Sequence, residues 1–234
     1  MAVGVERKTV ASVGTAAEAV SRPLVIVEGE QRAGRAVILC GHAANHVPAE
    51  CADLGLSSGD LQRHIAWDPG ALGVARGLAE RLKAPLAYST VSRLIVDLNR
   101  TEADDDAIAT VSEMTLIPGN QTLSDVQRRD RFVRFHAPYH ARVGELMAAR
   151  AARPVAPVVI AVHTFNPVYR GVARPWAIGV LYGERPRLGR ALIAALKADD
   201  PSMIVGDNEP YSPADRVYRT LERHADGQGL DSVM

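Results

Sequence analysis

Short apolar runs alternate with helical patterns along most of this chain, and that alternation limits the folds open to it. Strands are expected at residues 24–28, 36–40, 86–89, 94–98, 158–163, 176–182 and 203–206. Helices are expected at residues 58–64, 69–82, 124–150, 187–198 and 213–224. This order predicts an α/β fold in which helices flank both faces of a mixed, mostly parallel sheet.

The helix expected at residues 124–150 has the clearest pattern. Aromatic side chains recur in it at three- and four-residue steps, the spacing of one helix face. Ser124 is placed to cap its N-terminus, since a serine hydroxyl can accept from the first free amides. Pro138 has no amide hydrogen, so a kink or break is expected near residues 135–137.

Composition predicts a globular protein of one domain. The 234 residues are 47% hydrophobic and 23% charged, which is ordinary for a protein with a full core. Residues 1–21 are rich in Ala, Val and Ser without periodicity, and we expect a flexible tail there. Residues 22–234 are then a single α/β domain. The sequence carries no signal for an oligomeric state.

Charge and hydropathy exclude several classes of partner. Lys and Arg total 27, as do Asp and Glu, so the basic excess that nucleic acids or anionic membranes require is missing. There is no apolar run of about 18 residues that could span a membrane. The N-terminus lacks a secretory signal pattern, and Cys40 and Cys51 are expected to be free thiols. We therefore expect a cytoplasmic protein acting on a small molecule.

Two histidines stand at the ends of strands that look buried. His42 follows the apolar run at 36–40, and His163 ends the run at 158–163. Open α/β sheets place their active sites at the carboxyl ends of strands, so the two imidazoles are expected to converge. Neutral imidazole is a common zinc ligand, and a catalytic zinc has three protein ligands and one open position. The pair predicts a metal site for zinc or another divalent ion.

The third metal ligand has three candidates. Asn45 stands three residues after His42, a step at which a second ligand often joins a histidine, but an amide is a weaker donor than a carboxylate. Asp68 and His46 are the alternatives.

A group that binds anions is expected beside the metal. Asn99 and Arg100 follow the run at 94–98, and a guanidinium binds a carboxylate through two parallel hydrogen bonds. Asp97 could orient Arg100 or Arg93 through an ion pair.

Further candidates are scattered along the chain. Tyr139 and His140 lie in the long helix, where such residues more often belong to the core. Asn208 lies in a polar turn after a strand and could form a pocket wall. Glu184 follows a glycine and could act as a general base.

Several segments, in order, resemble the N-formylglutamate amidohydrolase family. The run Gly-His-Ala-Ala-Asn-His-Val-Pro at 41–48 resembles the family signature Glu-His-Ala-Ser-Asn-x-x-Pro. The remaining segments are residues 64–71, 92–93 with 97–100, 117–120, 138–140, 162–165 and 206–211.

The resemblance implies a fold and a reaction. The family is similar to the zinc carboxypeptidase and aspartoacylase group, with a phosphorylase/hydrolase-like arrangement. The implied reaction is metal-dependent hydrolysis of N-formyl-L-glutamate or a related acidic N-acyl amino acid. Its products are formate, or another acid, and the amino acid.

The resemblance also implies roles for individual residues. His42 and His163 would hold the metal, with Asn45 at the place of a glutamate in the related zinc hydrolases. The substrate α-carboxylate would be bound by Asn99 and Arg100. A second carboxylate would be bound by Arg93.

The sequence departs from the family pattern at two places. Gly41 and Ala44 replace the acid and the serine of the signature. The family continues into a strand with a Glu-x-Arg-x-Asp-Leu motif, whose glutamate is a candidate general base, and this sequence ends before it. We therefore expect either that the sequence is truncated or that this protein lacks the base. In the second case Glu184 or Glu209 would replace it, or the protein would bind carboxylates without catalysis.

Overall fold

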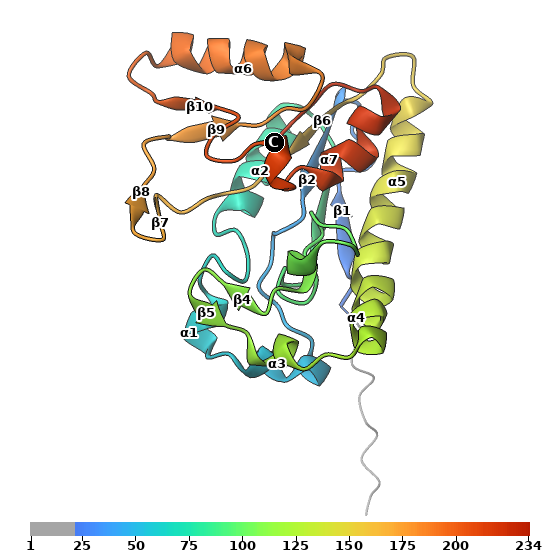
Figure 1. Cartoon of the computed structure of the whole chain (residues 1–234). Helices are drawn as coiled ribbons and strands as arrows, with labels where there is room; N and C mark the ends of the chain where they lie inside the picture. The colour runs from blue at the N-terminus through green and yellow to red at the C-terminus, as the bar shows by residue number, and fades with distance from the viewer. Residues whose placement is uncertain (1–21) are drawn as a thin grey trace, which may run out of the picture.

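The structure is a computed structural model that describes residues 22–234, and a five-stranded sheet forms its centre (Figure 1). In spatial order the strands are β1 (Val25–Glu28), β3 (Leu86–Ser89), β2 (Ala36–Cys40), β6 (Val158–Ala161) and β11 (Ser232–Val233). β1 runs antiparallel to β3, and the other neighbours are parallel. The tail expected at residues 1–21 lies outside the described residues.

The pairing of β2 with β6 positions the histidines. Ile38 lies opposite Ile160, and all five residues of β2 are buried. Because the two strands are parallel, their carboxyl ends lie at the same edge of the sheet. His42 and His163 each follow two residues after their strand, so both emerge at this edge.

Helices cover both faces of the sheet, as the alternation predicts. Alanines of α2 (Ala71–Arg81) pack against Ile38 and its neighbours on one face. On the other face, Val37 and its neighbours pack against α5 (Ala137–Ala151) and α7 (Arg219–His224). The predicted α/β fold is confirmed.

A smaller unit of two parallel strands, β9 (Ile178–Val180) and β10 (Val205–Asp207), extends the architecture. α6 (Pro186–Asp199) covers it, and Met234 exchanges two backbone hydrogen bonds with Leu181, which joins the unit to β11. The remaining elements are short: η1 (Ala49–Gly55), α1 (Ser58–Leu61), η2 (Asp105–Ile108), β4 (Val111–Ser112), β5 (Thr115–Leu116), α3 (Pro118–Gln121), β7 (Val168–Tyr169), β8 (Val172–Ala173), η4 (Pro213–Asp215) and η5 (Asp226–Gln228).

The long helix is continuous but not uniform. It consists of α4 (Asp125–Arg131), a π-helical segment (Phe132–His136) and α5, so the expected irregularity before Pro138 is confirmed. The predicted cap is also confirmed. Ser124 and Gln127 form a capping box, in which each side chain bonds the other's backbone amide.

The strand predicted at residues 94–98 is wrong. This segment forms turns, with Ile95 donating to the carbonyl of Ser92 and Arg100 donating to that of Asp97. Its apolar side chains are buried in a second core, formed largely by loops and the start of the long helix. Burial in this core explains why residues 94–98 are apolar although they are not part of the sheet.

No helix among residues 22–234 is long and apolar enough to cross a membrane. Cys40 is buried and Cys51 half-buried, and both are free thiols as expected.

Tyr139 offers a test of the core beneath the sheet. The residue is 1% exposed, and its hydroxyl has no hydrogen-bond partner within residues 22–234. We expect Tyr139→Phe to raise the free energy of unfolding in urea by about 1 kcal/mol, because it removes an unsatisfied buried hydroxyl. Tyr218 is the matched control, since its buried hydroxyl lies 2.7 Å from the Ser232 hydroxyl. Tyr218→Phe should lower the unfolding free energy, and equal effects of the two variants would contradict the argument.

Candidate functional site

The two strand-end histidines meet, as the sequence predicts. The ring centres of His42 and His163 lie 4.6 Å apart in an edge-to-face arrangement. Asp68, just before α2, reaches the same point because its backbone amide donates to the carbonyl of His42, at 2.9 Å. One potential ligand atom from each of the three residues lies within 4.8 Å of the others.

Asp68 is at the centre of this group. One carboxylate oxygen, Oδ2, lies 2.9 Å from Nδ1 of His163 and 3.5 Å from Nδ1 of His42. It also accepts from the backbone amide of Thr164, at 3.2 Å. Asp68 is only 1% exposed, so its charge is held away from bulk water.

A second carboxylate, Asp97, orients His42 from the other side. His42 donates from Nε2 to Oδ1 of Asp97 at 2.8 Å, and the backbone amide of Asn99 donates to the same oxygen. Arg93 donates to Oδ2 of Asp97 at 2.5 Å, as expected, and its other terminal nitrogen lies 3.5 Å from Asp68. A histidine held through one ring nitrogen by a carboxylate presents the other nitrogen in a fixed direction, an arrangement common at metal sites.

The electrostatics of the group favour a cation. Burial would raise the pKa of Asp68 and Asp97, but the charges of their partners, chiefly His42 for Asp68 and Arg93 for Asp97, hold both well below 3.8. Burial and Arg93 lower the pKa of His42, yet the two carboxylates outweigh them and raise it. Burial lowers the pKa of His163 despite its hydrogen bond to Asp68, which favours the neutral, ligating form.

The group passes a simple test of fit to a metal ion. Nδ1 of His42 and Oδ1 of Asp68 are buried and have no hydrogen-bond partner within the described chain. Two ionised carboxylates face one guanidinium, Arg93, so the surroundings carry a negative excess. Two imidazoles and a carboxylate are a donor set that zinc and similar divalent ions accept. The group could therefore hold such an ion.

The other predicted third ligands lie outside the group. The Asn45 amide donates to the backbone carbonyl of Leu61 at 2.8 Å, which fixes the loop that follows β2. His46 is exposed. Of the three alternatives, the structure brings Asp68 to the histidines.

The side chains of Asn99 and Arg100 contact residues outside the metal-binding group. The Asn99 amide donates to the carbonyl of Val217, and its oxygen accepts from the backbone amide of Thr220 at 2.9 Å. Arg100 pairs with Asp106 at 2.9 Å. The two residues hold their loop against the segment before α7, because the expected strand at 94–98 does not carry them to the sheet edge.

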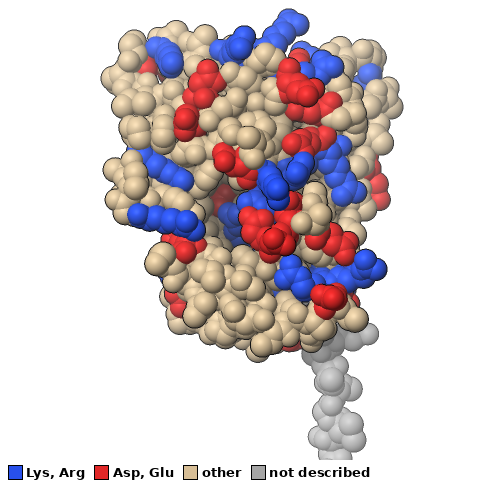
Figure 2. All heavy atoms as spheres, viewed as in Figure 1, with Lys and Arg blue, Asp and Glu red and all other residues tan. Residues whose placement is uncertain are grey.

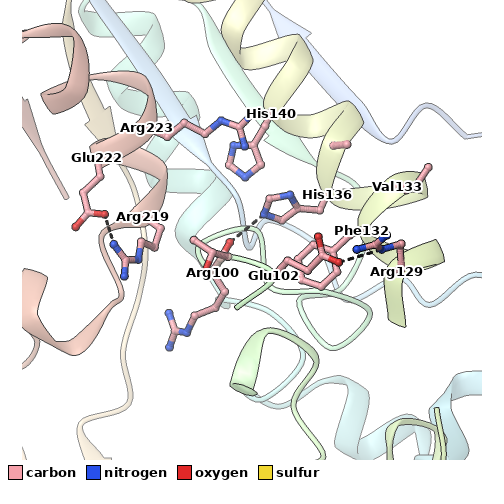
Figure 3. Close-up of a pocket in the computed structure, with 12 residues that line it drawn as sticks. Arg100, Glu102, Arg129, Phe132, Val133, His136, His140, Arg219, Glu222 and Arg223 are labelled. Atoms are coloured by element: carbon pink, nitrogen blue, oxygen red, sulfur yellow. Dashed lines mark hydrogen bonds and ion pairs between the residues drawn. The ribbon is translucent and has the colours of Figure 1, made fainter. Parts of the chain in front are cut away.

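Arg100 lines a different cleft, of about 740 Å³, between the long helix and α7 (Figure 3). The lining includes Arg219 and Arg223, His136 and His140, and none of the residues of the metal-binding group. In Figure 3, Arg219 pairs with a glutamate of its own helix. The metal-binding group therefore does not line this cleft.

Two histidines beside this cleft, His140 and His224, are joined by hydrogen bonds that connect parts of the fold. His140 donates from Nε2 to the carbonyl of Leu98 at 2.9 Å, so its Nδ1 must accept from Nε2 of His224, at 2.8 Å. Burial, then His136, His224 and Arg223, lower the pKa of His140 to about 2. Burial and Arg223 lower the pKa of His224 to about 4. His140 therefore holds α7 to the loop after β3 in its neutral form.

The hydrogen-bonded pair of His140 and His224 predicts that acid destabilises the fold. Between its unfolded pKa of 6.5 and its folded pKa of about 4, His224 binds more protons in the unfolded chain. The free energy of unfolding should therefore fall as the pH falls from 6.5, by roughly 3 kcal/mol at pH 4 for this residue. Denaturation at several pH values should show a smaller fall in His224→Gln, which can still donate to His140. An equal fall in His224→Gln and the wild type would contradict the role of His224.

The remaining candidates occupy varied positions. Glu184 and Glu209 are exposed and form no ion pair within residues 22–234. The Asn208 side chain accepts from the backbone amide of Tyr182 at 2.9 Å and shapes the turn after β10. Tyr139 lies in the core against the sheet.

Sequence reasoning assigned no role to two features, one beside the metal-binding group and one next to the β7–β8 hairpin. His64 donates from Nε2 to the carbonyl of Thr164 at 2.7 Å and lies 3.4 Å from Asp68, so it closes the group from the α1 side. Its spacing of four residues from Asp68 was a usable signal. The second feature is Arg174, near Tyr211, which no local pattern connects to the histidines.

Comparison with known proteins identifies the family of this chain. The sequence model of the N-formylglutamate amidohydrolase family matches residues 34–234. The chain belongs to the N-formylglutamate amidohydrolase family. The resemblance seen in the sequence motifs is thereby confirmed, and family membership places the chain among the amidohydrolases.

Two solved structures are similar to this member of the N-formylglutamate amidohydrolase family. The crystal structure of gene product Atu2144 from Agrobacterium tumefaciens is 41% identical, with a TM-score of 0.86. N-formylglutamate amidohydrolase from Ralstonia eutropha JMP134 is 19% identical, with a TM-score of 0.55, and supports the fold alone. Each comparison covers 90% of this chain and 83% of the other. No curated protein matches the chain.

Proposed function

We propose that this protein hydrolyses the amide bond of N-formyl-L-glutamate, or of a related acidic N-acyl amino acid, with a divalent metal, zinc by preference. The observation that carries the proposal is the buried group of His42, Asp68 and His163 at the carboxyl edge of the sheet. Family membership supplies the substrate class. The products would be formate, or another acid, and the free amino acid.

The orientation and charge of the three metal-binding side chains are fixed by their neighbours in the protein. Asp97 fixes the His42 ring so that Nδ1 faces Asp68, and the low pKa of Asp68 keeps that carboxylate ionised at neutral pH. His163 is neutral because burial lowers its pKa. Zinc bound here would supply Lewis acidity, lowering the pKa of water and polarising the acyl carbonyl. Arg93 contacts both carboxylates, Asp68 and Asp97, and helps to hold them in position for the ion.

A general base must take the proton of water and return it to the leaving nitrogen. Glu184 and Glu209 are the carboxylates proposed for this step. Glu184 and Glu209 follow β9 and β10, two parallel strands whose carboxyl ends lie at one edge of the smaller unit. Both side chains are exposed and would have to turn toward the substrate.

The proposal keeps other expectations from the sequence as predictions. They are a single domain over residues 22–234, a cytoplasmic location and a small-molecule partner. Binding of the substrate carboxylates by Asn99, Arg100 and Arg93 is also retained as a proposal, and the first two would have to give up their present contacts.

Formate release tests the proposal. Purified protein is dialysed against a chelator, and formate production from N-formyl-L-glutamate is then followed with and without one equivalent of added zinc. We expect turnover with zinc and none in the chelated protein. Cobalt or manganese in place of zinc tests the choice of ion. Calorimetric binding of substrate without turnover under any ion would favour the non-catalytic alternative and contradict the hydrolase.

A further inference from the structure

Arg174 follows the β7–β8 hairpin and is held by aromatic rings. Its guanidinium carbon lies 4.6 Å from the ring centre of Tyr169, 4.7 Å from that of Tyr211 and 5.8 Å from that of Phe165. Its Nη2 donates to the Tyr211 hydroxyl at 2.9 Å. Its backbone amide donates to the carbonyl of Pro167, which closes the hairpin. The position of the side chain is thus determined from several directions.

The charge of Arg174 has no partner of opposite sign. It forms no ion pair within residues 22–234, whereas Arg93 faces two aspartates and Arg100 faces Asp106. Aromatic faces attract a guanidinium but carry no formal charge, so they order the side chain without neutralising it. A pre-ordered, uncompensated guanidinium is suited to bind a carboxylate through two hydrogen bonds.

The aromatic side chains join Arg174 to the metal-binding group. Phe165 directly follows Thr164, whose amide donates to the Asp68 carboxylate at 3.2 Å. All three rings are half-buried, so this part of the chain faces solvent rather than the core. Figure 2 shows the same face hollowed near its centre, with basic side chains gathered at the rim over β7–β8.

We propose that Arg174, held by Phe165, Tyr169 and Tyr211, binds a carboxylate of the substrate and sets the preference for acidic N-acyl amino acids. The inference rests on the hydrolase function proposed above and assigns its specificity to a residue outside the sequence motifs. N-formyl-L-glutamate offers two carboxylates, and Arg174 binds one of them, in addition to the contacts retained above for Asn99, Arg100 and Arg93, while the amide faces the histidines.

Substrates with one carboxylate masked test this assignment. Steady-state kinetics of the zinc-loaded wild type, Arg174→Gln and Arg174→Lys are compared on N-formyl-L-glutamate, its α-amide and N-formyl-L-glutamine. Arg174→Gln should lower kcat/KM on N-formyl-L-glutamate by about 10²-fold, mostly through KM, because a charge-assisted contact is lost. The loss should vanish on the substrate that lacks the bound carboxylate, which identifies that carboxylate. The kcat/KM of Arg174→Lys on N-formyl-L-glutamate should lie between those of the wild type and Arg174→Gln, since lysine keeps the charge but cannot form two parallel hydrogen bonds.

Arg170→Gln is the matched control, because Arg170 is an exposed cation of the same hairpin that stacks on Tyr169 alone, at 5.3 Å. Equal losses on all three substrates, or an Arg174→Gln effect no larger than that of Arg170→Gln, would overturn the assignment. Calorimetric titration of N-formyl-L-glutamate into each protein separates the two proposals. If the wild type binds without turnover, the hydrolase proposal fails, and weaker binding by Arg174→Gln still supports the role of Arg174. Unchanged binding by that variant overturns it.

Discussion

Replacing Asp68 with asparagine should lower kcat/KM for N-formyl-L-glutamate by about 10³-fold or more. The change removes the only carboxylate in the group and with it one ligand and one negative charge. Metal catalysis of this kind is worth several kcal/mol, and each 1.4 kcal/mol is about tenfold in rate. Formate release at saturating zinc measures the effect.

Asp60→Asn is the control for that experiment. Asp60 is a carboxylate of α1 that pairs with Arg63 and takes no part in the group. It should keep near wild-type activity. Asp68 is buried, so its replacement could lower activity by destabilising the fold. The His163 side chain is 18% exposed, so His163→Gln removes another ligand of the group with less risk to the fold and should also lower activity. Activity above a tenth of the wild type in folded Asp68→Asn would contradict the proposed site.

Replacing Asp97 with alanine should have the largest effect on stability. Asp97 accepts from His42, Arg93 and the backbone amide of Asn99, and its side chain is 6% exposed. Its loss leaves the buried His42 ring and the Asn99 amide without their acceptor, and leaves Arg93 with only one of its two carboxylates. Breaking a buried pair from one side typically costs about 3–5 kcal/mol, and we expect a decrease of at least about 3 kcal/mol. Urea denaturation followed by circular dichroism measures it.

Asp106→Ala is the matched control for Asp97→Ala, because it also removes the aspartate of an ion pair with an arginine. Asp106 pairs with Arg100, but its side chain is 62% exposed, so water screens the interaction. The expected change is below about 1 kcal/mol. Similar losses in the two variants would show that the network around Asp97 is not the stabilising element described here.

Four of the five strands of the sheet could be predicted because they are largely apolar, whereas the two-residue strand β11 was not predicted. The runs at β2 and β6 are covered by helices on both faces, and such strands appear in a sequence as short continuous apolar segments. The segment at 94–98 has the same appearance but lies in a core formed by loops. A short apolar run records burial and does not distinguish a strand from a buried turn.

The site could be predicted in part for the same reason. His42 and His163 follow strands, so their convergence depends only on parallel neighbours at one edge. The wrong strand at 94–98 led to the expectation that Arg100 faces them. Asn99 is instead held by residues about 120 positions later, and contacts of that range leave no local pattern. The aromatic surroundings of Arg174 are equally long-range.

Anomalous diffraction at the zinc edge, from crystals of the zinc-loaded protein, tests the metal site most directly. We expect one strong peak about 2.0–2.2 Å from Nδ1 of His42, a carboxylate oxygen of Asp68 and a ring nitrogen of His163. The peak should vanish in Asp68→Asn crystals grown in the same way. A peak elsewhere, or none between these three residues, would contradict the metal site and the hydrolytic mechanism built on it.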